Sequence, residues 1–461
     1  METRIETDSL GEVHVPADAL YAAQTQRAKD NFPISSLRFG RRFIEALGLV
    51  KGAAAKANKQ LGLVDDGRAD AIVDAADQVR TGALDDQFVL DIFQTGSGTS
   101  TNMNTNEVIA TVATRALGET VHPNDHVNYG QSSNDVIPTA MHVAARVAIE
   151  QELIPALERF HTSLEAKASE FDDVIKSGRT HLMDATPVRL GQEFGGYASQ
   201  IAHAIRRLRL ASDDLAELAL GGTATGTGIN RPADFPAHAI GFISEATGLQ
   251  FREAENHFEA QAAKDAYVFA AGALNTLAVA VVKIVNDIRH LSSGPTSGLS
   301  EIQLPAIQPG SSIMPGKVNP VMSEALMMVA ARVMGNATTI TVGGQHGNYE
   351  LNVMMPVMAH AMLESIEILT NGLDAFRTNC LDGIQANRTR AQELLEKNPS
   401  IATALNATIG YDKASKVAKK AAAEGRSVRD VLLEMDLVPE DQLDAVLDVR
   451  SMTEPGIPGQ N

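Results

Sequence analysis

The most regular feature of the chain is a repeat of apolar positions between residues 267 and 288. Successive steps alternate between four and three residues, and the positions are Tyr267, Ala271, Leu274, Ala278, Val281, Val285 and Ile288. This spacing places all of them on one face of an α-helix and is typical of a helix that packs along other helices. We therefore expect these side chains to be structural core residues.

Several other long segments have a helical pattern of apolar and polar residues. The expected helices cover residues 42–61, 69–81, 153–171, 190–220, 321–340 and 352–380. Helices of this length imply a long bundle, because each must bury an apolar face against its neighbours. The pattern predicts a mainly α protein with a central bundle of long helices.

Changes along the chain predict three domains. Residues 1–135 mix helical segments with polar, Gly-containing stretches, whereas long helices dominate residues 136–387. Residues 388–461 are more charged and have shorter helical segments, which indicates a small C-terminal helical domain.

Three segments interrupt the helical pattern. Residues 94–107, QTGSGTSTNMNTNE, contain almost no apolar side chains, so we expect a polar loop that runs into a helix and stays outside the core. A second polar stretch, VHPNDHVNYGQSSND, covers residues 121–135. Residues 292–320 are rich in Gly, Pro and Ser, and such a long loop is usually functional or mobile. Asn319-Pro320 can begin the next helix, which places Glu324 near its first turn.

Composition narrows the class of protein. The 461 residues carry a net charge of −18, which argues against nucleic-acid binding because phosphates require basic side chains. The N-terminus, METRIETDSL, has no apolar core typical of a secretory signal, and the purely apolar stretches are far shorter than the ~20 residues that span a bilayer. Cys380 is the single cysteine, so an internal disulfide is excluded and a reducing compartment is indicated. We expect a soluble, cytoplasmic protein without a membrane partner.

Familiar nucleotide and metal motifs are incomplete in this chain. Gly96-Ser97-Gly98 lacks the third glycine of a dinucleotide fingerprint, and the spacing from Gly310 to Gly316-Lys317 is one residue too long for a phosphate loop. His122 and His126 are four residues apart, but the intervening Pro123 disfavours a shared helical face for a metal. We expect neither a metal nor a cofactor.

Polar segments that lie far apart in the sequence remain as candidates for chemistry. They are Ser97-Gly98-Thr99, Ser132-Ser133-Asn134, Thr180-His181 and residues 310–319. Their hydroxyls and amides, with the ammonium of Lys317, would suit an oxygen-rich anion such as a dicarboxylate. Taken singly, each also has an ordinary structural interpretation, since Ser and Asn cap helices and a lone His is often structural.

The segment 310–320, GSSIMPGKVNP, resembles the signature of the fumarase/aspartase superfamily. The resemblance covers nearly the whole chain, from VPADALYAAQTQRA near Val15 to LNATIGYDKA near Leu405. Within the superfamily, the chain is most similar to class II fumarate hydratases. It has Thr-His in GRTHLMDATP where aspartases typically have Thr-Gln, Gly316 where they usually have Ala, and the fumarase forms HPND and QSSND.

This resemblance implies a fold and a reaction. The implied fold has three mainly α domains, and the central helices associate into a twenty-helix core in a homotetramer whose active sites are shared between subunits. The implied reaction is the reversible hydration of fumarate to L-malate, without metal or cofactor. It requires a base for a proton next to a carboxylate, donors for the resulting aci-carboxylate, and an acid for the departing hydroxide.

The matching positions imply roles for individual residues. Ser311 is expected to be the base, His181 to transfer protons to and from water, and Glu324 to orient His181 and raise its basicity. The expected substrate-binding residues are Ser97, Gly98, Thr99, Ser132, Ser133, Asn134, Thr180, Ser312, Lys317 and Asn319.

A second, non-catalytic dicarboxylate site of the family matches His122, Pro123, Asn124 and Asp125. Many members have a basic residue shortly before this motif, whereas this chain has Gly118-Glu119-Thr120. We therefore do not expect tight anion binding there.

Two other functions stay open at this point. The first is an ammonia-lyase of the same superfamily that acts on aspartate, against which Thr180-His181 and Gly316 argue. The second is a non-catalytic helical structural protein that retained the fold, against which the presence of Ser311 and Lys317 argues.

Overall fold

The computed structural model of the chain describes residues 2–457 and divides into two compact units. Unit 1 comprises Met1–Ala156, Ala204–Val279 and Val329–Asn371. Unit 2 comprises Leu157–His203, Ala280–Met328 and Gly372–Asn461. Because these units do not follow the order of the sequence, the three domains 1–135, 136–387 and 388–461 stay a prediction.

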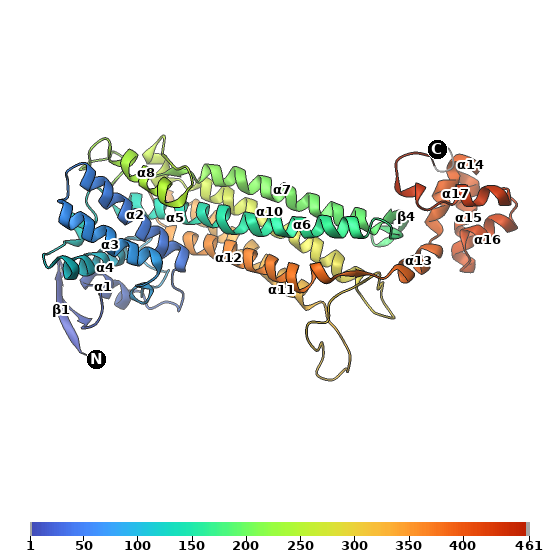
Figure 1. The fold of residues 1–461 in the computed structure, drawn as a ribbon, viewed down its shortest axis with the longest axis horizontal. Coiled ribbons are helices and arrows are strands. Elements are labelled where there is room, and N and C mark those ends of the chain that lie inside the picture. The colour runs from blue at the N-terminus through green and yellow to red at the C-terminus, as the bar shows by residue number, and fades with distance from the viewer. Residues whose placement is uncertain (1, 458–461) are drawn as a thin grey trace. The chain divides into compact units, whose positions relative to one another are not determined.

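Five long helices, which are labelled in Figure 1, contribute residues to both units. They are α6 (Ile154–Glu170), α7 (Leu190–Asp214), α10 (Asp265–Leu291), α11 (Val321–Gly344) and α12 (Met355–Asn379). The helices expected from the sequence are confirmed here, except that α7 ends at Asp214 rather than near residue 220. The repeat between residues 267 and 288 lies on α10, and its side chains are buried. The mainly α fold with long helices is therefore confirmed.

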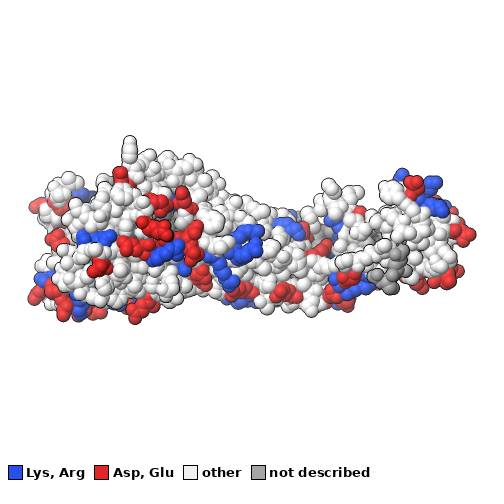
Figure 2. Space-filling view, turned by 90° about the horizontal axis from the view of Figure 1, so that it is seen from above, with Lys and Arg blue, Asp and Glu red and all other residues white. Residues whose placement is uncertain are grey.

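Some faces of the long helices stay uncovered within one chain. By length and composition, α10 and α11 could cross a membrane, with 50% and 28% of their apolar windows buried. Exposed apolar side chains include Phe269 and Val279 on α10 and Met328 and Val342 on α11. On the surface drawn in Figure 2, wide areas carry neither acidic nor basic side chains. The core helices of soluble proteins can be equally long and apolar, because a helix in the middle of a bundle buries several of its faces against neighbouring helices.

In unit 1, helices pack around α2 (Arg41–Gln60). It lies against α3 (Asp66–Thr81), α5 (Ser133–Ala148) and α8 (Phe235–Thr247). Gly48 permits the close approach of α2 and α3, because a Cβ atom there would lie 2.7 Å from the backbone nitrogen of Arg80. The remaining elements are β1 (Thr3–Asp8), β2 (Gly11–Pro16), α1 (Ala23–Asn31), α4 (Thr99–Leu117), β5 (Glu217–Leu218), β6 (Arg252–Glu253), α9 (His257–Ala262), β8 (Gly347–Asn348) and β9 (Leu351–Asn352).

The polar stretch 94–107 runs into helix α4 as expected, but the prediction that it stays outside the core is wrong. Residues 100–107, which form the first turns of α4, are buried. The buried Glu107 carboxylate accepts hydrogen bonds from the backbone N–H groups of Ala22 and Gln24, each at 2.9 Å. Burial raises the pKa of Glu107, although these hydrogen bonds act in the opposite direction. Polar residues can enter a core when other segments supply their hydrogen-bond partners, which a local sequence pattern does not reveal.

Unit 2 combines a β-hairpin with the C-terminal helices. Strands β3 (Ile175–Thr180) and β4 (Met183–Arg189) are antiparallel, and Thr180 pairs with Met183. Apolar residues between positions 402 and 446 form a core for the last helices. The other elements are β7 (Ile302–Gln303), β10 (Gln385–Ala386), α13 (Arg388–Glu396), α14 (Asn406–Ile409), α15 (Tyr411–Glu424), α16 (Val428–Glu434) and α17 (Leu443–Val446).

Candidate functional site

In unit 1, the predicted binding residues meet where helices α4 and α5 begin. The hydroxyl of Thr99 lies 2.7 Å from the hydroxyl of Ser97 and 2.7 Å from that of Ser133. Ser132 is the N-cap of α5, and its hydroxyl accepts a hydrogen bond from the backbone of Asn134 at 3.2 Å. Helix N-termini attract anions because their backbone N–H groups point outward and carry partial positive charge. These hydroxyls therefore form a half-buried cradle suited to a carboxylate, which we call the cradle.

Two glycines allow the segments of the cradle to come together. Gly98 has a φ of +73°, a left-handed conformation that side chains disfavour, and a Cβ atom there would lie 3.0 Å from Ile137. A Cβ atom on Gly96 would lie 1.9 Å from the carbonyl oxygen of Val353, so any side chain at this position would push the two backbones apart. The motif QTGSG therefore sets the path of the backbone into α4.

A glycine-rich loop, residues 221–228, borders the cradle. The buried Asp135 carboxylate accepts hydrogen bonds from the backbone of Ser132 at 2.8 Å, Gly221 at 3.0 Å and Thr223 at 2.9 Å. Burial raises the pKa of Asp135, and these three donors act against that rise. The Asn134 side chain donates to the carbonyl of Ala224 at 2.8 Å. Asp135 and Asn134 thus fasten this loop to the start of α5.

The HPND motif forms a tight turn that satisfies its own backbone. His122 is the N-cap of a π-helical turn, Pro123–Val127, and its Nδ1 accepts hydrogen bonds from Asn124 at 3.2 Å and Asp125 at 3.1 Å. The carboxylate of Asp125 lies 3.3 Å from the same ring nitrogen. A nearby carboxylate opposes the binding of an anion. The second dicarboxylate site at this motif stays a prediction, with weak binding as the expectation.

In unit 2, Thr180 and His181 lie at the tip of the hairpin formed by β3 and β4. His181 and Leu182 form its two-residue turn with φ values of +55° and +60°. A two-residue turn of this kind requires a left-handed backbone conformation, which Gly or Asn usually adopts. The backbones of His181 and Leu182 therefore adopt a costly conformation. Both side chains are exposed, and among residues 2–457 the imidazole of His181 has no hydrogen-bond partner.

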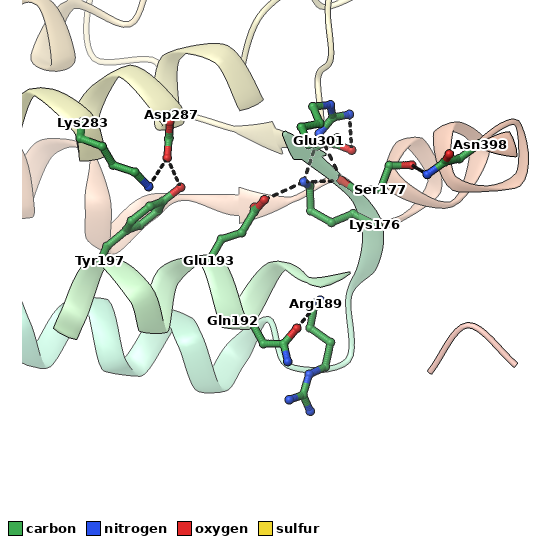
Figure 3. Close-up of polar contacts among 11 residues, drawn as sticks. Lys176, Ser177, Arg189, Gln192, Glu193, Tyr197, Lys283, Asp287, Glu301 and Asn398 are labelled. Atoms are coloured by element: carbon green, nitrogen blue, oxygen red, sulfur yellow. Dashed lines mark hydrogen bonds and ion pairs between the residues drawn. The ribbon is translucent and has the colours of Figure 1, made fainter. Parts of the chain in front are cut away.

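The base of this hairpin is held by buried charges. Figure 3 shows Lys176 between two carboxylates, with Nζ at 2.9 Å from Glu193 and 3.4 Å from Glu301. Glu301 has no exposed surface, and its carboxylate also accepts two hydrogen bonds from the Arg179 guanidinium, at 2.7 and 3.0 Å. Asn398 donates to the hydroxyl of Ser177 at 3.1 Å. The hairpin is thus anchored firmly beneath an exposed tip.

Residues 310–319 form a loop whose two ends are joined by hydrogen bonds, which we call the closed loop. The backbone of Gly310 donates to the carbonyl of Lys317 at 2.8 Å, and the side chain of Asn319 donates to the carbonyl of Gly310 at 2.5 Å. The Ser311 hydroxyl oxygen accepts hydrogen bonds from the backbone N–H groups of Ile313 at 3.2 Å and Met314 at 3.0 Å. The side chains of Ser312 and Lys317 are exposed.

The structure brings together one part of the predicted site and leaves another part dispersed. In unit 1, Ser97, Gly98, Thr99, Ser132, Ser133 and Asn134 form the cradle. In unit 2, the predicted residues lie on the hairpin tip, on the closed loop and on the first turn of α11, where Glu324 is exposed. Within the described part of unit 2, no side-chain hydrogen bond or ion pair joins Ser311, His181 and Glu324. Their catalytic roles therefore stay predictions.

Several buried polar residues beneath these segments were not singled out from the sequence. The clearest is Lys51, which has no exposed surface and donates to Asn128 and Gln131. A signal was present, because Lys51 follows Leu47 by four residues and precedes Ala54 by three, which is the spacing of a buried helix face. A charged residue at such a position indicates a specific buried partner.

The chain is similar to known lyases over nearly its full length. Residues 11–335 match a family described as "Lyase", and residues 401–454 match one described as "Fumarase C C-terminus". A protein of Halobacterium salinarum named "Fumarate hydratase class II" is 57% identical, and the similarity covers 98% of each chain. A Corynebacterium efficiens protein with the same name is 54% identical, with 98% of this chain and 96% of that protein covered. The solved class II fumarase of Schistosoma mansoni is 38% identical with a TM-score of 0.96, covering 98% of this chain and 100% of that one.

Proposed function

Since this chain belongs to the class II fumarate hydratases, we propose that it catalyses the reversible hydration of fumarate to L-malate. The observation that carries this proposal is the 57% identity to a protein of that name over 98% of both chains. The cradle of unit 1 supports it physically, because paired hydroxyls at two helix N-termini suit a carboxylate of a small dicarboxylate substrate.

We assign the base to Ser311, which takes the proton from the carbon next to a carboxylate of malate. A serine hydroxyl is a very weak acid, so its deprotonated form needs stabilisation. The backbone N–H groups of Ile313 and Met314 already donate to this oxygen, and such donors favour its negatively charged form. The closed loop thus supplies part of the activation that the proposed role requires.

We assign to His181 the transfer of protons to and from water, which includes protonation of the departing hydroxide. Glu324 is the carboxylate that orients its imidazole. The exposed hairpin tip leaves both ring nitrogens of His181 available for a substrate and a partner group. Lys317 and Asn319 would hold a carboxylate, with Thr180 and Ser312 beside them. As negative charge develops in the aci-carboxylate, fixed donors and an ammonium stabilise it more than they stabilise the bound substrate.

We propose that the active site is completed in a homotetramer, in which different chains supply the cradle and the catalytic residues. The exposed apolar side chains of α10 and α11 support this assembly, because only 50% and 28% of the apolar windows of these helices are buried within one chain. Burial of these apolar side chains between chains would leave the assembly soluble, which agrees with the cytoplasmic location expected from the sequence.

The test is to follow the loss of fumarate absorbance with purified protein in water, and then with added ammonium. We expect turnover in water alone and no dependence on ammonium. Turnover only with ammonium would instead indicate an aspartate ammonia-lyase. No turnover in either condition, with an intact tetramer, would indicate a structural protein with the same fold.

A further inference from the structure

Lys51 is a buried ammonium held by uncharged groups. Its Nζ donates to the side-chain oxygens of Asn128 at 2.8 Å and Gln131 at 3.0 Å. Buried lysines are normally paired with carboxylates, but no carboxylate of residues 2–457 lies within the 4.0 Å of an ion pair with Lys51. Burial lowers the pKa of Lys51 to about 7, and the charge of Asp135 acts against that change.

The two acceptors of Lys51 lie directly before the cradle. Asn128 donates from its side-chain nitrogen to the carbonyl of Gln131 at 3.1 Å, and Gln131 precedes the N-cap residue Ser132. The same Asn128 oxygen that binds Lys51 also accepts from Asn102 at 3.3 Å and Asn106 at 3.2 Å. Both of these asparagines belong to α4, the helix that begins at Thr99.

Lys51 therefore joins the three elements on which the cradle depends, which are α2, α4 and the segment that begins α5. A shift of Asn128 or Gln131 would move the start of α5 relative to the start of α4, and would change the 2.7 Å contact between Thr99 and Ser133. Small displacements of positioned groups of this kind weaken the contacts that they make with a bound substrate.

Below about pH 7, where Lys51 is protonated, its charge is also available to an anion. A lysine that is paired with a carboxylate has its field largely cancelled, whereas amide oxygens leave the net positive charge in place. Asp135 is the charged group that acts on Lys51, and its carboxylate is bound by three backbone donors. A positive charge beside the residue that precedes α5 adds to the attraction of this helix N-terminus for a carboxylate.

We propose that Lys51 is a positioning residue for the hydration reaction, which fixes residues 128–131 between α4 and α5 and adds a buried positive charge behind the hydroxyls of Thr99 and Ser133. This inference rests on the proposed function and extends it. It assigns a residue that does not touch the substrate but acts through Asn128 and Gln131.

The experiment compares Lys51→Met with Lys56→Met, an exposed lysine on the same helix that serves as the matched control. For Lys51→Met we expect KM for fumarate to rise about tenfold while kcat changes less than threefold, because binding is weakened equally in the ground and transition states. Lys56→Met should keep the kinetics of the wild type. Circular dichroism and size-exclusion chromatography establish that each variant is folded and assembled.

A double-mutant cycle tests whether Lys51 acts through Asn128. Asn128→Ala alone should raise KM, and Lys51→Met combined with it should raise KM little further, because residues in one network are not additive. Fully multiplicative effects would overturn the proposal, as would a wild-type KM in folded Lys51→Met. Should Lys51→Met fail to fold, Asn128→Ala tests the proposal instead, because it keeps the lysine and removes one of its acceptors. An unchanged KM in folded Asn128→Ala would then overturn the proposal.

These outcomes separate this inference from the proposed function. If the wild type and Lys56→Met hydrate fumarate and Lys51→Met does so with the same KM, only the role of Lys51 is wrong. If the wild type itself does not hydrate fumarate, the proposed function fails and the role of Lys51 fails with it.

Discussion

Two lysines without exposed surface lie beneath the two groups of predicted substrate residues, and different partners hold them. In unit 1, Lys51 donates to amide oxygens of Asn128 and Gln131 under the cradle. In unit 2, Lys176 lies between the carboxylates of Glu193 and Glu301 under the hairpin that carries His181. Neutral partners leave the first charge able to attract an anion, whereas carboxylates cancel most of the second. The first lysine thus suits binding, and the second suits anchoring.

The cradle in unit 1 and the predicted catalytic segments in unit 2 also differ in exposure and in the contacts between their side chains. The cradle is half-buried, and its hydroxyls already contact one another within unit 1. The hairpin tip and the closed loop of unit 2 are exposed, and their predicted catalytic groups make no side-chain contacts with one another in the described residues. A site built in this way has a preformed binding part and a catalytic part that awaits further contacts.

The largest effect is expected at the exposed catalytic groups. Ser311→Ala and His181→Asn should each lower kcat by about 10²–10⁴-fold, since general acid and base groups contribute that much. Both variants should keep the oligomeric state of the wild type, because neither side chain packs against a core. Steady-state fumarate kinetics and size-exclusion chromatography measure the two properties, and wild-type rates in both variants would remove these catalytic assignments.

Mixing the two inactive variants sharpens this prediction. If different chains supply Ser311 and His181 to one site, dissociation and reassembly of the mixture should restore part of the activity. Reassembled hybrids without activity would count against shared sites.

The next effect is expected at the anchor of the hairpin. Glu301→Gln removes the charge that Lys176 and Arg179 share, so it should lower the free energy of unfolding by about 3–5 kcal/mol, the usual cost of breaking a buried ion pair. Denaturant unfolding at a fixed protein concentration measures the change. Glu440→Gln, at an exposed position of unit 2, is the control and should change stability little. Equal stabilities of the two variants would contradict the anchoring role.

A smaller effect is expected in the cradle. Thr99→Val removes the hydroxyl that contacts Ser97 and Ser133. It should raise KM for fumarate by about 10- to 100-fold, since a hydrogen bond to a charged group contributes roughly 1.5–3 kcal/mol. Thr111→Val on the same helix is the control. If both variants have the wild-type KM, Thr99 does not bind the substrate.

The smallest effect concerns the dependence of stability on pH. The pKa of folded Lys51 is lowered by burial to about 7, whereas an unfolded lysine titrates near 10.5. Above pH 7 the unfolded chain therefore holds a proton that folded Lys51 has released, and stability rises with pH by about 1 kcal/mol between pH 7 and pH 8. This rise should be smaller in Lys51→Met than in Lys56→Met when unfolding is measured at both pH values. Identical slopes would show that Lys51 is not a buried titrating group.

The apolar pattern determined much of the fold by itself. The helical spacing of residues 267–288 identified the core face of α10, because the α-helical period is a local property that one sequence displays. Motif resemblance likewise identified the family and the segments that carry the candidate site. These features depend on neighbouring residues or on whole segments rather than on contacts between distant ones.

Only the tertiary structure decided how the buried polar groups are satisfied. The stretch 100–107 enters the core because Ala22 and Gln24 supply donors to Glu107, and Lys51 is buried because Asn128 and Gln131 approach it from a distant loop. A hydrogen bond between segments so far apart depends on the path of the whole backbone, and no local pattern of apolar and polar residues contains that path.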